Sequence, residues 1–282
     1  TGGASSIKTS TFTGLQPALA ITAPATAVFD GNTVDACGVT TGIDTIVVTS
    51  VGAAGLAVTN NTIKNSKDNI INVAANGDLV NVMFNTFSGN VTTATNAAGT
   101  TLNMTHNYWG GVAAPTAPAN VSVANPLGAA ASAGAAFAVG VAPIALDNSV
   151  AAGVNIVSST GATLLGATTF AANPVTGVAT PTIAGSTVTI KKYFDVFGNA
   201  ATTGAVIRFS GAVAGDEIWF FNAAWGRWEK ATGQIPNVLA GYVEVTVTTT
   251  SGPTNVQLQG LPFLLLNNKV NPTVPAAVAA QQ

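Results

Sequence analysis

Apolar and polar residues alternate in short runs along this chain, a pattern typical of β-strands. Four such runs are rich in β-branched residues and bounded by Gly, Asn or Asp, namely residues 45–49, 80–84, 186–190 and 242–247. Hardly any window shows the i, i+3, i+4, i+7 spacing of an amphipathic helix. The pattern therefore predicts an all-β protein.

The first half of the chain repeats itself. Residues 58–63 are echoed at 82–87 and at 104–109, which aligns Asn61, Asn85 and Asn107. Self-similarity at about 22–24 residues is typical of a solenoid, because about that many residues make one coil of three short strands. Stacked coils place the three asparagines in a column at a turn. There each amide can bond the next, and Asn tolerates a left-handed backbone.

The repeats end in the motif His-Asn-Tyr-Trp-Gly-Gly at residues 106–111, followed by Pro115. With the Asn repeats, this motif resembles the right-handed parallel β-helix family of surface proteins and pectate-lyase-like solenoids, over residues 20–125. The resemblance implies that Tyr108 and Trp109 cap the last layer of the solenoid. A cap is needed because a solenoid end leaves backbone and apolar groups without a neighbour. The N-terminal end shows no obvious cap.

From about Val154 onward, predicted strands recur every 8–12 residues between Gly, Pro and Asn turns, which favours a β-sandwich. This half resembles a β-sandwich module found toward the C-termini of long bacterial and archaeal cell-surface proteins. Five sequence blocks carry the resemblance: 170–174, 192–196, 216–221, 225–228 and 258–263. The resemblance implies a structural or assembly unit rather than a catalytic one.

These observations predict a short right-handed parallel β-helix followed by an antiparallel β-sandwich. We expect the β-helix with its N-terminal lead-in at 1–125, a connector at 126–150, the sandwich at 151–266 and a tail at 267–282. Residues 126–146 are apolar and long enough to span a bilayer as a helix. They are mostly Ala and Gly, contain Pro143 and lack flanking Lys or Arg, so we expect a connector and no integral membrane span.

Charge is scarce throughout the sequence. Of 282 residues, 7% are charged, the net charge is −2 and 48% are hydrophobic, whereas charged residues make up about 25% of an average domain. This composition excludes intrinsic disorder, which needs low hydrophobicity and high net charge. It also argues against nucleic-acid binding, which needs a basic stripe. Uncharged β surfaces rich in Thr, Asn and Ala suit contacts between copies of the chain.

The candidate chemistry is thin. His106 is the only histidine and Cys37 the only cysteine, and no nucleophile motif accompanies either. The acidic residues of the first half do not repeat in register with the coils, and that half contains no Arg. The acids at 30 and 35 flank a Gly-Asn turn that lacks a full calcium-loop pattern. We therefore predict no catalytic residues, no metal site and no cofactor.

Four asparagines begin Asn-x-Ser/Thr triplets: Asn60, Asn90, Asn103 and Asn120. Such triplets are acceptors for N-glycosylation in exported proteins. In a chain this rich in Asn, Ser and Thr, about that number arises by chance. The sequence therefore permits glycosylation without indicating it.

The aromatic segment 219–228 is the most informative surface candidate. If Ile218 and Phe220 face the core, strand alternation sends Trp219 and Phe221 to the opposite face, with Trp225 nearby. An exposed Trp-Phe pair is suited to contacts between subunits or to stacking on sugars. The alternative is that a connector or the first domain covers the pair.

Together these features favour a secreted, non-enzymatic structural subunit that self-assembles at the cell surface into a layer, sheath or filament. Its partner would be copies of itself. The alternative is a carbohydrate-binding or carbohydrate-cleaving β-helix protein, an adhesin or a lyase, with surface glycans as partner. The chain opens at Thr1 without Met or an apolar leader, as expected for a processed product or a segment of a longer protein.

Overall fold

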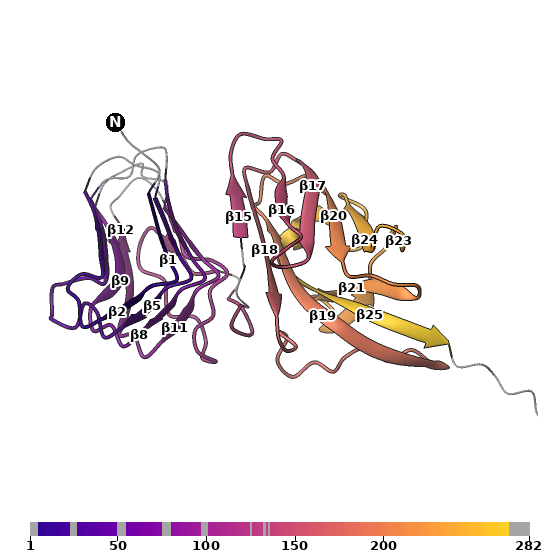
Figure 1. Ribbon diagram of the computed structural model, residues 1–282, viewed down its shortest axis with the longest axis horizontal. Coiled ribbons are helices and arrows are strands. Elements are labelled where there is room, and N and C mark those ends of the chain that lie inside the picture. The colour runs from indigo at the N-terminus through magenta and orange to yellow at the C-terminus, as the bar shows by residue number, and fades with distance from the viewer. Residues whose placement is uncertain are drawn as a thin grey trace, which may run out of the picture.

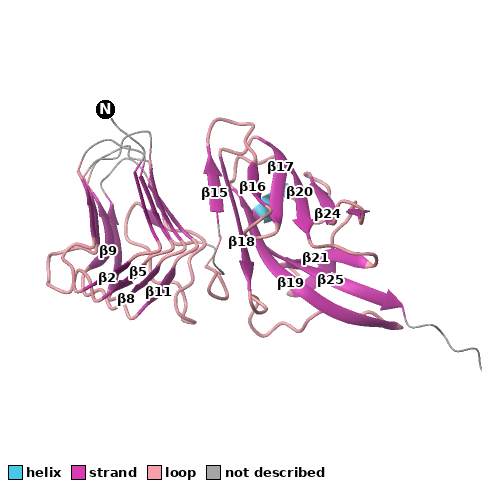
Figure 2. Cartoon of the chain, in the orientation of Figure 1, coloured by secondary structure: helices cyan, strands magenta, loops and turns pink. Residues whose placement is uncertain are grey.

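The computed structural model describes residues 5–22, 27–49, 55–74, 80–96, 101–124, 126–131, 134 and 136–270. Within these ranges the protein is built from β-strands, with one short 3-10 helix, η2 (Asn255–Leu258) (Figures 1 and 2). A parallel solenoid forms the N-terminal part, and two antiparallel sheets form the C-terminal part. The predicted fold class, a β-helix followed by a sandwich, is confirmed.

Three parallel sheets form the sides of the solenoid. Sheet A contains, in spatial order, β1 (Ser5–Lys8), β4 (Ala27–Asp30), β7 (Leu56–Thr59), β10 (Val80–Met83), β13 (Leu102–Asn103) and β14 (Val121–Ser122). Sheet B contains β2 (Thr11–Thr13), β5 (Thr33–Asp35), β8 (Thr62–Lys64) and β11 (Thr86–Ser88). Sheet C contains β3 (Leu19–Ile21), β6 (Ile46–Val48), β9 (Asn69–Val73) and β12 (Thr92–Asn96).

The solenoid core consists of columns of stacked apolar side chains. In sheet B, the register places Phe12 beside Val34, Val34 beside Ile63 and Ile63 beside Phe87. All but Phe12 are fully buried. Since successive side chains on a strand point to opposite faces, the flanking Thr residues of each strand lie outside. This alternation explains why the β-branched repeats form coils.

Two antiparallel sheets form the sandwich. Sheet D contains β15 (Ala136–Val139), β18 (Leu164–Phe170), β19 (Ser186–Gly198), β25 (Gln259–Val270), β21 (Asp216–Asn222) and β22 (Arg227–Lys230). Sheet E contains β16 (Leu146–Asn148), β17 (Val154–Thr160), β20 (Gly204–Ser210), β24 (Tyr242–Val247) and β23 (Ile235–Asn237). Their inner faces meet around Phe209, whose ring lies 5.1 Å from that of Phe194 and 5.0 Å from that of Phe263.

The structure corrects two predicted boundaries. The segment 126–150, expected to be a connector, supplies two edge strands of the sandwich, β15 on sheet D and β16 on sheet E. The tail expected from residue 267 begins later, because β25 stays paired with β19 as far as Val270. Residues 271–282 lie outside the described residues. In the part of the chain that the structure describes, no helix is long and apolar enough to cross a membrane.

The solenoid and the sandwich share a buried apolar cluster, which we call the domain junction. It comprises Met83 and Phe84 of the solenoid, Leu127, and Phe170 and Phe197 of sheet D. The two domains accordingly lie side by side in Figure 1. Because all five side chains are buried, the junction covers the flank of the last coils.

Candidate assembly interface

A ladder of asparagines runs through the solenoid at the corner between sheets A and B. The Nδ2 of Asn61 donates to Oδ1 of Asn85 at 2.9 Å, and the Nδ2 of Asn85 donates to Oδ1 of Asn107 at 3.0 Å. The backbone N–H groups of Asn61 and Asn85 donate to the same oxygens. All three residues are buried, so each amide replaces the water that the corner backbone would otherwise need.

The ladder has one more rung than the sequence revealed. Asn32 donates to Oδ1 of Asn61 through its backbone N–H and its Nδ2. It lies 29 residues before Asn61, because the loop between β5 and β6 lengthens that coil. The ladder ends at Ser10, whose backbone N–H donates to Oδ1 of Asn32.

The left-handed residue at each corner is the one before the ladder asparagine, and not the asparagine itself. These residues are Thr9, Gly31, Asn60, Phe84 and His106, with φ between 48° and 66°. A left-handed backbone is uncommon for bulky side chains and costs about 1–3 kcal/mol. At the last two corners the conformation is retained because Phe84 and His106 leave the solenoid there and enter contacts with sheet D.

His106 is therefore part of the domain junction. Its ring lies 4.4 Å from Phe197 and 6.2 Å from Phe84, centroid to centroid, and Nδ1 is 3.0 Å from the hydroxyl of Thr105. Burial lowers the pKa of His106 to about 3, against a smaller opposing effect of the Gln259 backbone. The imidazole is thus neutral at physiological pH and packs as an aromatic ring.

The predicted cap residues lie at the C-terminal end of the solenoid. The Trp109 ring lies 4.7 Å from that of Phe87 and is 7% exposed, so it covers the last layer of sheet B. Tyr108 pairs with Thr86 and contacts the domain junction. This end of the solenoid is therefore closed both by its own aromatic residues and by the sandwich.

The N-terminal end of the solenoid remains open. β1, β2 and β3 are the edge strands of sheets A, B and C, so three rows of backbone groups face away from the coil below. Inside this edge lies a hollow of about 340 Å³, lined by apolar side chains that include Ile7, Leu19 and Ile21. Lys8 is the only charged residue among residues 1–29.

The aromatic segment divides into a covered and an exposed part. As the alternation predicts, Ile218 and Phe220 lie in the sandwich core. Trp219 and Phe221 lie on the other face of sheet D, half-buried in a cluster with apolar side chains at 175, 178 and 183. Part of the segment between β18 and β19 thus covers the pair.

Trp225 stays outside this cluster. It is 70% exposed in the turn between β21 and β22, and the guanidinium of Arg227 lies 5.8 Å from its ring. Of the three predicted contact residues, only Trp225 presents a largely free aromatic surface.

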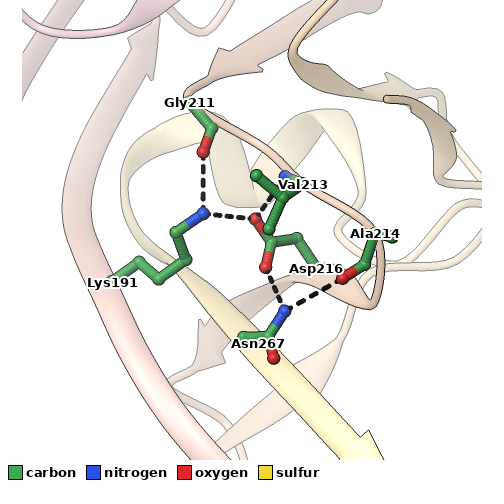
Figure 3. A network of polar contacts seen from close by, with 6 residues as sticks. All are labelled: Lys191, Gly211, Val213, Ala214, Asp216 and Asn267. Atoms are coloured by element: carbon green, nitrogen blue, oxygen red, sulfur yellow. Dashed lines mark hydrogen bonds and ion pairs between the residues drawn. The ribbon is translucent and has the colours of Figure 1, made fainter. Parts of the chain in front are cut away.

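A buried charged network fixes the middle of sheet D (Figure 3). The Nζ of Lys191 donates to Oδ2 of Asp216 at 2.6 Å and to the carbonyl of Gly211 at 2.7 Å. Oδ1 of Asp216 accepts from Nδ2 of Asn267 at 2.7 Å, and Oδ2 accepts from the backbone N–H of Val213 at 2.8 Å. The network ties β19, β21 and β25 to the loop after β20. The sequence analysis missed it, because its members lie on three strands far apart in the chain.

The acids of the solenoid hold neighbouring coils together. Oδ1 of Asp30 accepts from Thr59 and Asn60, and Asp35 bonds Asn65 and pairs with Lys64 at 3.2 Å. Among the residues that the structure describes, no three His, Cys, Asp or Glu side chains are grouped so that they could hold a metal ion.

Comparison with known proteins finds no matching family model, no curated relative and no solved structure. The open end of the solenoid and the exposed Trp225 are thus the features of this structure that bear most directly on function.

Proposed function

We propose that the protein is a secreted, non-enzymatic structural subunit that self-assembles into an extracellular layer, sheath or filament. The observation that carries this proposal is the open N-terminal end of the solenoid, which combines three strand edges with an apolar hollow. Unpaired strand edges are templates for pairing with another chain, and natural proteins usually block them with charges, proline or a covering loop. Here Lys8 is the only charge near the edge.

The low charge of the exterior supports the same function. Five ion pairs are found among the described residues, and four of them lie in the sandwich. A surface with few charges of either sign provides little repulsion between copies. Contacts between such surfaces depend on apolar burial and main-chain hydrogen bonds, so we expect assembly to persist at high salt.

The direct test is sedimentation velocity over a wide range of protein concentration, combined with negative-stain electron microscopy of the same samples. The proposal predicts larger particles with a regular repeat as concentration rises, in low and high salt alike. Particles that stay monomeric at every concentration would rule it out. Fractionation of the native cells tests the location separately, with the protein expected in the surface fraction.

The alternative is a carbohydrate-binding adhesin, and the observation that favours it is Trp225. An exposed indole with a neighbouring guanidinium offers a flat face and a hydrogen-bond donor, the combination used to stack on sugar rings. A glycan array probed with the wild type and with Trp225→Ala distinguishes the two functions. The adhesin predicts binding that the variant loses, whereas the structural subunit predicts none.

A further inference from the structure

The four Asn-x-Ser/Thr triplets differ in how the fold uses their asparagines. The Nδ2 of Asn60 donates to Oδ1 of Asp30 at 2.8 Å and joins two coils. Asn90 is used at both ends: Oδ1 accepts from the backbone N–H of Ser66, and Nδ2 donates to the carbonyl of Ile63, each at 2.9 Å. Both side chains are thus part of the solenoid.

Asn103 is also engaged. Its Nδ2 donates to Oδ1 of Asn81 at 3.3 Å. Its Oδ1 accepts from the backbone N–H and the hydroxyl of Thr105, at 3.1 and 2.7 Å. Because Thr105 is the hydroxyl residue of the same triplet, both polar groups of this triplet are already bonded within the fold.

Asn120 differs from the other three. Its residue is exposed, and its side-chain amide has no hydrogen-bond partner in the described part of the chain. The backbone is nevertheless fixed: its carbonyl accepts from the backbone N–H of Leu102 at 2.8 Å and from Nδ2 of Asn96 at 2.9 Å. A turn closed by the Val121 N–H and the Pro118 carbonyl, with φ of 59° at Asn120, directs this residue away from the coil.

We propose that Asn120 is an N-glycosylation site of the folded protein. In the reaction, Nδ2 of Asn120 forms a bond to the anomeric carbon of a sugar supplied by a lipid-phosphate-linked saccharide. The bond between that carbon and the phosphate oxygen breaks, the phosphate leaves with the electron pair, and Nδ2 loses one proton. Ser122 completes the triplet that the transferase recognises.

The position of Asn120 gives the glycan a structural consequence. Asn120 directly precedes β14, the last strand of sheet A. A saccharide there hinders the addition of another strand to β14, as bulky or charged groups do at other sheet edges. The open N-terminal coil then remains as the end available for assembly. This consequence, like the modification itself, rests on the proposed export of the protein.

The test is glycopeptide mapping by mass spectrometry of the protein recovered from its native cells, together with cell fractionation. We expect a saccharide on the peptide containing Asn120 and none on Asn60, Asn90 or Asn103. Surface-located protein that is unmodified at Asn120, or modified at any of the other three, overturns the site while leaving the proposed function standing. Protein found only inside the cells overturns the proposed function instead.

Three variants sharpen this test. Asn120→Asp and Ser122→Ala should both remove the saccharide, since each destroys the triplet, while Ser122→Thr should retain it. Thermal unfolding should be unchanged in Asn120→Asp, because its amide bonds nothing, and lowered in the matched Asn90→Asp. Equal losses of stability in the two Asp variants would overturn the proposal, since Asn120 would then be structural.

Discussion

The imidazole of His106 lies 4.4 Å from the ring of Phe197, and this contact joins the solenoid to the sandwich. A second buried titratable group, Asp195, lies two residues before Phe197 on β19. It is 2% exposed, and its Oδ1 has no hydrogen-bond partner. Since Phe194 and Val196 face the sandwich core, alternation places Asp195 on the opposite face of sheet D. These two groups have opposite effects on stability as the pH changes.

The first prediction concerns His106. Burial lowers its pKa from 6.5 to about 3, so between these values the unfolded chain binds a proton that the folded protein does not. The contribution of His106 to the free energy of unfolding therefore falls as the pH drops from 6.5 toward 3, by roughly 3–5 kcal/mol in total. His106→Phe should remove this loss. Urea unfolding at several pH values measures it, and parallel curves for variant and wild type would contradict the prediction.

The second prediction concerns Asp195. Burial raises its pKa from 3.8 to about 7, so the folded protein holds a proton that the unfolded chain loses. Its contribution to stability is therefore complete below pH 3.8 and falls as the pH rises toward 7. Between about pH 4 and 6.5 the effects of Asp195 and His106 oppose each other, each near 1.4 kcal/mol per pH unit. Relative to the wild type, Asp195→Asn should gain stability as the pH rises through this range, and His106→Phe should gain it as the pH falls. Differences of the same sign would refute the assignment.

The third prediction compares two rungs of the asparagine ladder. Asn85→Ser removes the acceptor for the backbone N–H of Asn61 and leaves the carbonyl of Val58 unpaired in the buried interior. Buried groups left without partners cost about 1–3 kcal/mol each. Asn32→Ser should cost less, because the groups it frees, the Ser10 N–H and the Ile7 carbonyl, lie at the open coil, where water replaces the amide. Equal losses in the free energy of unfolding would show that burial along the ladder is uniform.

The ladder also shows how much could be predicted from sequence. Asn61, Asn85 and Asn107 stand out because their spacing is nearly constant and their neighbours are alike. Asn32 does not stand out, because the loop between β5 and β6 breaks the period. Local pattern reveals a coil, whereas an insertion at a corner changes the spacing without changing the stack.

Non-local packing accounts for the remaining differences between sequence and structure. Strand β15 contains three Ala and Val residues and one Phe, a composition that alone does not distinguish a strand from a connector, and it forms only by pairing with β18. Alternation correctly placed Trp219 on the outer face of sheet D. Its partial burial depends on apolar residues some 40 positions earlier, around Val178, and no local signal reports such a contact.

The fourth prediction concerns the buried ion pair of sheet D. Lys191→Met leaves the carboxylate of Asp216 buried without its cation, which typically costs 3–5 kcal/mol. Asp216→Asn alone leaves the ammonium unpaired but 28% exposed, so its cost should be smaller. The double variant should be more stable than Lys191→Met. A double-mutant cycle by urea unfolding measures this coupling, and additive losses would contradict it.

The account as a whole depends on the open N-terminal coil as the surface where copies meet. A matched pair of variants isolates this surface: Ile7 lines the hollow and is 36% exposed, whereas Val157 on sheet E is 37% exposed. Lysine at either position adds the same charge at nearly the same exposure. Circular dichroism and thermal unfolding of both variants confirm that the fold is retained.

Sedimentation velocity of Ile7→Lys, Val157→Lys and the wild type, at one concentration at which the wild type assembles, is the most direct measurement. We predict that Ile7→Lys sediments as a folded monomer while Val157→Lys assembles like the wild type. Assembly of folded Ile7→Lys to the wild-type extent would contradict the account.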